Sequence, residues 1–172
     1  MKDIEKGITA NDITDIRMTD AEYNWSAGYN EFTFKCRIKG DDDILHMTEQ
    51  RHDDGEGFVI NSEKDDIWEH MTTGELFKLD DKLREEIEYA HYHEEIENAQ
   101  TVDDCKNLMY EFMENDNVFF RKAAPRLWKE LDAREKKMLD AEKPSVIKQL
   151  KNDKPEHGEK KKNGPSRTET VR

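Results

Sequence analysis

The spacing of apolar residues changes near residue 60, and this change constrains the fold more than any other feature of the sequence. Between Glu31 and Lys39, apolar and polar residues alternate one by one, which is typical of a strand with one buried face. Beyond Asn61, apolar residues recur every three or four positions, as on one face of a helix. A chain with strands first and helices afterwards is expected to form an α+β protein, in which the helices pack on a small antiparallel sheet.

About three strands are predicted before residue 61. They cover residues 31–39, 44–50 and 58–60, and short acidic turns separate them. The apolar face of the first two is formed by Phe32, Phe34, Cys36, Ile38, Leu45 and Met47. The connections are too short for parallel pairing, which needs a crossover, so an antiparallel meander is expected. Residues 1–29 suit a short helix or a short strand equally, and their structure is left open.

Three to four helices are predicted after the strands. The first is expected to be capped by Ser62 and to end near Gly74. The second covers residues 80–100, is capped by Asp80 or Asp81, and has its apolar stripe mainly in its first half. Because this stripe can pack on the sheet, the second helix is predicted to connect the two layers.

The third predicted helix is the most amphipathic in the chain. It opens with Thr101 and Asp104, which have the spacing of a capping box. Its apolar face is formed by Val102, Cys105, Leu108, Met109, Phe112 and Met113. After a break at residues 115–117, a last helix is predicted from Val118 and a segment that Pro125 initiates.

The chain is predicted to form one acidic domain, residues 1–142, and a basic, largely disordered tail, residues 143–172. A chain of 172 residues is most simply one domain. Only 34% of the residues are apolar and 40% are charged, so the core must be small. Disorder is expected from about Lys151, because the end of the chain has few apolar groups to offset the entropy of ordering.

Charge is distributed unevenly along the chain. The net charge is −13, but residues 1–117 carry 12 basic and 32 acidic residues, a net −20, whereas residues 118–172 carry 16 and 9, a net +7. The acidic body is expected to repel nucleic acid and to attract a basic or nucleic-acid-binding protein. The basic part has three possible partners: phosphate groups, an acidic protein, or the acidic body of the same chain.

The helix at residues 80–100 supplies the first candidate site. Its acidic surface is predicted to include Glu85, Glu88, Glu94, Glu95 and Glu97. His91 and His93 lie among these carboxylates, which is a composition that suits a zinc, iron or manganese site. Because two residues correspond to about 200° around a helix, the two histidines point in different directions and cannot bind one ion together. A metal site would therefore need further ligands, with His46, His52 and His70 as candidates.

The start of the last helix supplies the second candidate site. An aromatic and basic patch is predicted from Phe119, Phe120, Arg121, Lys122, Arg126 and Trp128. Aromatic and arginine side chains are favoured at the centres of interfaces. The apolar pattern nevertheless favours a place for the aromatic side chains in the hydrophobic core, and the exposed patch is the alternative.

Several functional classes have no motif in this sequence. There is no P-loop, GxGxxG, GxSxG or HExxH motif, so no cofactor is predicted. The first residues lack a signal-peptide apolar region, and no apolar run approaches the length of a membrane span, so a cytoplasmic protein without membrane contact is expected. Cys36 and Cys105 are predicted to be buried, reduced thiols.

The favoured function is a non-enzymatic interaction or regulatory protein, with a nucleic-acid-mimicking inhibitor of phage or mobile-element type as its sharper form. The acidic body would bind a basic or nucleic-acid-binding partner protein. The alternative is a metal-dependent hydrolase built around His91 or His93. A structural role in a homo-oligomer or larger assembly is a third hypothesis.

Overall fold

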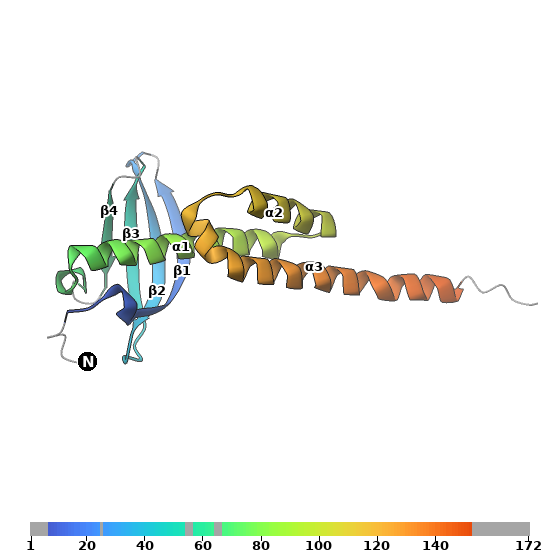
Figure 1. Ribbon diagram of the computed structural model, residues 1–172, viewed down its shortest axis with the longest axis horizontal. Coiled ribbons are helices and arrows are strands. Elements are labelled where there is room, and N and C mark those ends of the chain that lie inside the picture. Colours follow the sequence, from blue (N-terminus) through green and yellow to red (C-terminus); the bar gives the residue numbers. More distant parts are fainter. Residues whose placement is uncertain (1–6, 25, 54–56, 64–66, 153–172) are drawn as a thin grey trace, which may run out of the picture.

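The predicted α+β class is confirmed, and four strands rather than about three are present in the described part of the chain (Figure 1). The computed structural model describes residues 7–24, 26–53, 57–63 and 67–152. In chain order its elements are the 3-10 helix η1 (Ala10–Asp12), the strands β1 (Ile13–Asn24), β2 (Tyr29–Ile38), β3 (Leu45–His52) and β4 (Phe58–Ser62), the 3-10 helix η2 (Ile67–His70), and the helices α1 (Thr73–Asn98), α2 (Val102–Glu114) and α3 (Val118–Asn152).

The strands form an antiparallel meander in the order β1-β2-β3-β4. The register places Phe34 of β2 between Met18 of β1 and Met47 of β3. Phe34 is fully buried, and both methionines lie in or against the same core. The alternation at residues 31–39 therefore predicts the inward face of β2 correctly.

Two β-bulges explain why the sequence of β1 suits both a helix and a strand. The pairing of β1 with β2 shifts register once before Arg17 and once before Asp20, and Asp15 has a φ of 52°. A bulge adds one residue to a strand, which changes the side that the following residues face. The core-facing residues are consequently Ile13, Ile16, Met18 and Ala21. Their spacing of three, two and three hides the two-residue period.

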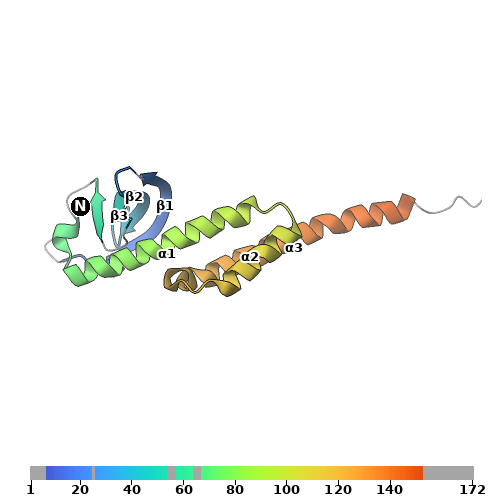
Figure 2. The ribbon, with the colours of Figure 1, turned by 90° about the horizontal axis from the view of Figure 1, so that it is seen from above.

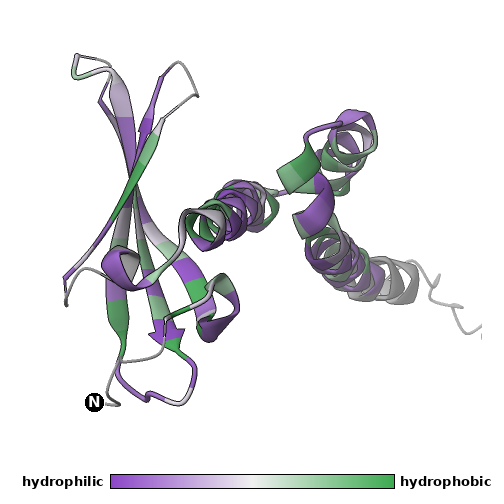
Figure 3. Ribbon diagram, turned by 60° about the vertical axis from the view of Figure 1, so that its left-hand side comes forward, coloured by the Kyte–Doolittle hydropathy of each residue, from purple (hydrophilic) through white to green (hydrophobic). Residues whose placement is uncertain are grey.

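α1 lies between the sheet and the other two helices. Figure 3 shows α1 between the strands and the pair formed by α2 and α3, and Figure 2 shows α1 running past the sheet alongside both of them. Contacts between α1 and α3 join Asp81 to Lys122, Glu86 to Arg126 and the Ala99 carbonyl to Arg134. Because the residue numbers of both segments increase in the same direction along these contacts, α1 and α3 are parallel. α2 lies between them in the sequence and runs in the opposite direction.

α1 takes part in two hydrophobic cores, because its apolar stripe changes face along its length. In the first half, Leu79 and Leu83 are buried against the sheet. In the second half, Tyr92 and Ile96 are buried against α2 and α3. Residues 83 and 92 are about 180° apart at about 100° per residue, so the second stripe lies on the opposite side of the helix. The second core is completed by Ala99, Cys105, Leu108, Phe112, Phe120, Ala123, Leu127 and Leu131.

α1 begins earlier than the sequence pattern predicts. Its cap is Thr72, whose hydroxyl accepts a hydrogen bond from the first turn at 3.3 Å, so the predicted caps Asp80 and Asp81 are wrong. Gly74 lies in the first turn of α1 and does not end a helix. Ser62 is the last residue of β4 and not a helix cap. A glycine is tolerated in the first turn because packing of the following turns on the sheet stabilises the helix.

The predicted capping box of α2 is confirmed. The Thr101 hydroxyl accepts a hydrogen bond from the Asp104 amide at 3.1 Å, and the Asp104 carboxylate accepts one from the Thr101 amide at 2.8 Å. Cys105 is buried as predicted, but Met113 is 72% exposed and is not part of the apolar face. Both cysteines of the chain are free and buried.

α3 is longer than predicted and contains two prolines. Asn117 caps it by accepting a hydrogen bond from the Phe119 amide at 2.8 Å. Pro125 lies inside α3 and does not begin it, and the helix continues to Asn152, past residue 143, where the tail was predicted to start. The disorder predicted for the tail falls mostly on residues 153–172, which lie outside the described residues. Although α3 is long, no helix in the described ranges is apolar enough to cross a membrane.

Candidate functional site

The predicted acidic residues of α1 separate into two groups. Glu94 and Glu97 are exposed and Glu95 is half-buried; all three belong to the last turns of α1, which has there passed the edge of the sheet (Figure 1). Glu85 and Glu88 are half-buried, and Glu88 accepts a hydrogen bond from the Asn117 side chain at 3.0 Å. Burial raises the pKa of Glu88. Of these five residues, only Glu94 and Glu97 are exposed.

The first turn of α2 adds another carboxylate at the same end of the helices. Asp103 has a side chain that is 89% exposed, and it lies 3.6 Å from the ammonium group of Lys106. We call the surface formed by Glu94, Glu95, Glu97 and Asp103 the acidic end. A lysine pair this exposed is worth little, so Lys106 offsets the charge of Asp103 only weakly.

His91 and His93 occupy separate environments, as the helical spacing predicts. His91 lies 3.8 Å from Glu95, whereas His93 forms a 2.8 Å hydrogen bond with Glu130 of α3 and stacks on the Tyr89 ring. Within the described ranges, no group of three or more His, Cys, Asp or Glu side chains is arranged to hold a metal ion. The hypothetical metal-dependent hydrolase therefore has no assembled site in this part of the chain.

The basic residues at the start of α3 bind the acidic helix of the same chain. Lys122 lies 3.8 Å from Asp81, and Arg126 lies 3.3 Å from the buried Glu86. The guanidinium group of Arg126 also stacks on the Tyr89 ring, 3.6 Å from its centre. We call these two ion pairs the α1–α3 seam. Of the three partners considered for the basic part, the chain's own acidic body is the one these two side chains contact.

The predicted aromatic and basic patch is divided between core and surface. Phe120 is 1% exposed and belongs to the helical core, so its assignment to a surface patch is wrong. Trp128 is partly buried and contacts Phe112 with a ring distance of 5.3 Å. Phe119 is half-buried, and Arg121 is exposed. The division follows the helical period, because Phe120, unlike Arg121, is on the α3 side that packs against α1 and α2.

A buried charge cluster between the sheet and α1 was not predicted. Glu49 of β3 is fully buried, and its Oε1 atom lies 2.5 Å from Nη2 of Arg51. The same Nη2 atom of Arg51 also bonds to Asp80 of α1, and Arg84 lies 3.7 Å from the second oxygen of Asp80. We call these four residues the charge cluster. One signal was available in the sequence: Glu49 continues the two-residue period of the apolar side of β3.

The environment of Glu49 favours the protonated form of its carboxyl group. Burial, a hydrogen bond to Asp80 and the charge of Asp80 raise the pKa of Glu49 to about 8, although Arg51 opposes this shift. The Oε2 atom of Glu49 is buried and has no hydrogen-bond partner among the described residues. With the proton on Glu49, the charge cluster holds two guanidinium charges against the carboxylate charge of Asp80, a net charge of +1.

Comparisons with known proteins do not add a family. Neither protein-family models, nor curated proteins, nor solved structures show a match to this chain. Its function must therefore be inferred from its own residues.

Proposed function

We propose that this chain is a non-enzymatic interaction or regulatory protein whose acidic end binds a basic partner protein in the cytoplasm. The observation that supports it is the exposure of the acidic end. Residues 73–117, which contain α1 and α2, carry 14 acidic and 4 basic residues, a net charge of −10. The α1–α3 seam pairs Asp81 and Glu86 with basic side chains, whereas Glu94, Glu97 and Asp103 of the acidic end are exposed. A surface of one sign steers an oppositely charged partner toward it.

The sharper form of this proposal is a nucleic-acid mimic. A partner that normally binds phosphate groups carries Lys and Arg on its binding surface, and these same residues would be attracted to the acidic end. The protein would then inhibit its partner by occupying the nucleic-acid site, as inhibitors of phage or mobile-element type do. Nucleic acid itself would be repelled by the acidic body.

Affinity capture from extract of the native host tests the proposal. The full chain is immobilised, and bound proteins are eluted at about 0.1 M and about 1 M salt, over which the Debye length falls from about 10 Å to about 3 Å. A basic partner is expected to bind at the lower concentration and to elute at the higher one. Added duplex DNA or RNA is expected to displace it if the sharper form holds.

A matched pair of variants locates the contact. The triple variant Glu94→Gln, Glu95→Gln, Glu97→Gln removes three charges from the acidic end. The control Glu22→Gln, Asp42→Asn, Asp53→Asn removes three charges from exposed positions in the sheet and its turns. The proposal requires that the first variant loses the partner and that the control keeps it. Capture that resists salt, equal binding by both variants, or no captured partner contradicts it.

A further inference from the structure

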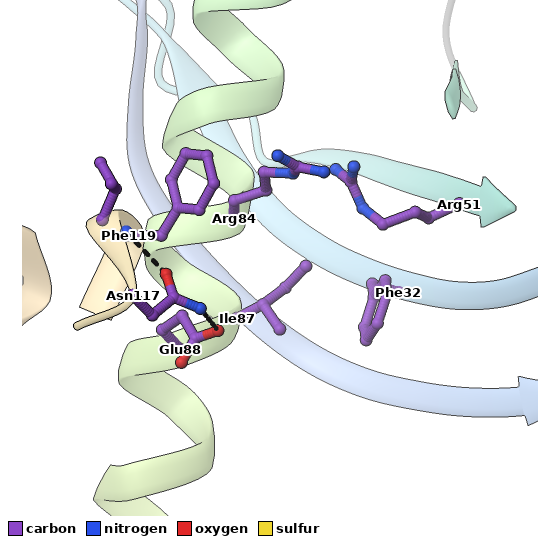
Figure 4. A pocket seen from close by; sticks show the side chains of 8 residues that line it. Phe32, Arg51, Arg84, Ile87, Glu88, Asn117 and Phe119 are labelled. Carbon is purple, nitrogen blue, oxygen red and sulfur yellow. Dashed lines mark hydrogen bonds between the residues drawn. The ribbon is translucent and has the colours of Figure 1, made fainter. Parts of the chain in front are cut away.

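A groove lies where the sheet, α1 and the start of α3 meet. Its volume is about 350 Å³, at the small end of the range of pockets that bind small molecules. Figure 4 shows its lining, which comes from β2, β3, α1 and the first turn of α3. The lining residues are Phe32, Arg51, Arg84, Ile87, Glu88, Asn117, Val118 and Phe119. The groove is therefore assembled by the sheet, α1 and the start of α3, which are distant in the sequence.

One end of the groove is cationic. Arg51 and Arg84 both contact Asp80, and Figure 4 shows their guanidinium groups next to each other on one side of the groove. Their side chains are 14% and 30% exposed, so both are largely immobilised yet reach solvent. The Arg84 guanidinium group also lies over the Phe119 ring, with the guanidinium carbon 4.8 Å from the ring centre. The raised pKa of Glu49 favours its neutral form, and with Glu49 neutral the charge cluster behind this end has a net charge of +1.

The rest of the groove is apolar, with a polar far end. Phe32, Ile87, Val118 and Phe119 provide the apolar walls. At the far end, the Glu88 carboxylate accepts a hydrogen bond from the side-chain NH₂ group of Asn117. The side-chain oxygen of Asn117 caps α3. A second negative charge on a ligand would meet Glu88 there. The groove is therefore complementary to one negative charge at one end of an apolar group.

We propose that this groove is a binding site for a small organic monocarboxylate with a compact hydrophobic body. The carboxylate lies against the guanidinium groups of Arg51 and Arg84, which present N–H groups in the planar arrangement that suits carboxylate oxygens. The hydrophobic body lies between Phe32 and Phe119. Polyanions such as nucleotides are excluded by Glu88 and by the acidic body. The groove is separate from the acidic end, so this proposal is tested independently of the partner protein proposed above.

Titration of the full-length protein with matched small molecules tests the proposal. The probes are phenylacetate, 3-phenylpropanoate and 4-methylpentanoate, with phenylacetamide as the uncharged counterpart and inorganic phosphate as the anion without a hydrophobic body. Binding is followed by ¹H–¹⁵N chemical shifts and by calorimetry. At least one carboxylate is expected to bind with a dissociation constant below about 1 mM, a range that is reasonable for a ligand of this size. Its shifts are expected at residues of the groove, and the amide is expected to bind at least about tenfold more weakly.

Three variants separate this site from non-specific binding. Arg84→Gln removes one guanidinium group and is expected to weaken carboxylate binding about tenfold, the size of one charge-assisted hydrogen bond. Val118→Trp fills the mouth of the groove, at a side chain that is 60% exposed, and is expected to abolish binding. Val59→Trp makes the same change on β4, at a side chain that is 47% exposed, and is expected to leave binding unchanged.

Four outcomes would overturn the proposal. They are the absence of groove shifts with every carboxylate, equal affinity for the amide, binding by Val118→Trp equal to that of the wild type, and groove shifts with phosphate as large as those with the carboxylates. The first three remove the site. The last shows that it recognises charge without a hydrophobic body. Circular dichroism of each variant establishes that the fold is intact, and Val118→Trp leaves the charge cluster untouched.

Discussion

Glu49 is a single inward-facing residue whose protonation determines the charge of the layer between the sheet and α1. Burying an ionised carboxylate is costly, and Glu49 shares Arg51 with Asp80, which Arg84 also contacts. The folded protein responds by holding a proton on Glu49, which is what its pKa of about 8 means. The unfolded chain releases this proton near the ordinary value of 4.5. Stability conferred by this group is therefore complete at low pH and is lost as the pH rises toward 8.

We predict that Glu49→Gln removes much of this pH dependence. The free energy of unfolding of the wild type should fall between about pH 5 and pH 8, because the folded state binds a proton that the unfolded state has lost. The variant has no proton to lose there, so it should be more stable than the wild type at pH 8.5. Urea unfolding at pH 5.5, 7 and 8.5, followed by circular dichroism, measures the difference.

The remaining pH dependence has other sources. Burial also raises the pKa of Glu86 and Glu88, so a smaller slope of the same sign should remain in the variant. Hydrogen bonds lower the pKa of Asp12 and Asp104, and these groups act at lower pH, below the window tested. Glu63→Gln, at an exposed position, is the control and should keep the wild-type slope. Equal slopes for Glu49→Gln and the wild type would show that Glu49 ionises normally.

At the scale of elements, α1 and α3 are held together by charge as well as by apolar contact. Glu86 is buried, and Arg126 of α3 supplies its counter-charge while covering Tyr89. Glu130 of α3 accepts a hydrogen bond from the Tyr89 hydroxyl at 2.5 Å and bonds to His93. Part of the basic charge of residues 118–172 is thus paired with acidic residues of α1 in the same chain.

We predict that Arg126→Ala destabilises the protein by about 1 to 2 kcal/mol, because Glu86 keeps its burial and loses its partner. The loss is limited because Arg126 is half exposed and Glu86 can take up a proton. Arg121→Ala, on the exposed side of the same helix, should change stability by less than about 0.5 kcal/mol. Adding Glu86→Gln to Arg126→Ala should restore part of the loss. Chemical denaturation measures all three, and equal effects of the two arginine variants would disprove the role of the seam.

At the scale of the whole molecule, α1 is the only described helix that belongs to both hydrophobic cores. The sheet core depends on its first half and the helical core on its second half. Helix formation is cooperative along the chain, so loss of packing in one core removes support from the other. The predicted single domain is therefore expected to unfold as one unit, although it contains two cores.

We predict that a destabilising substitution in the helical core also lowers the stability of the sheet. Leu131 is fully buried among α1, α2 and α3, and Leu131→Ala should cost about 2 to 5 kcal/mol. Native-state hydrogen exchange should show the same loss of opening free energy for the slowest amides of β2 as for those of α3. Loss of protection confined to α2 and α3 would mean that the two cores are separate domains.

Local patterns in the sequence determine the elements whose stabilising contacts are themselves local. The alternation at residues 31–39 and the capping box of Thr101 and Asp104 were predictable because a pleat and a cap depend on neighbours a few residues away. β1 was not predictable, since its bulges depend on the pairing with β2.

The tertiary structure determines which face of α1 packs against the sheet and which face packs against α2 and α3. The sequence pattern places the apolar stripe of this helix mainly in its first half, whereas in the fold the stripe changes to the opposite face as α1 leaves the sheet and meets α2 and α3. The charge cluster and the groove arise in the same way, because Arg51, Arg84 and Phe119 come together only after β3, α1 and α3 have packed. The sequence by itself thus determined the kinds of element and the unequal charge. The position of every possible site depended on packing between segments far apart in the chain, which no local period records.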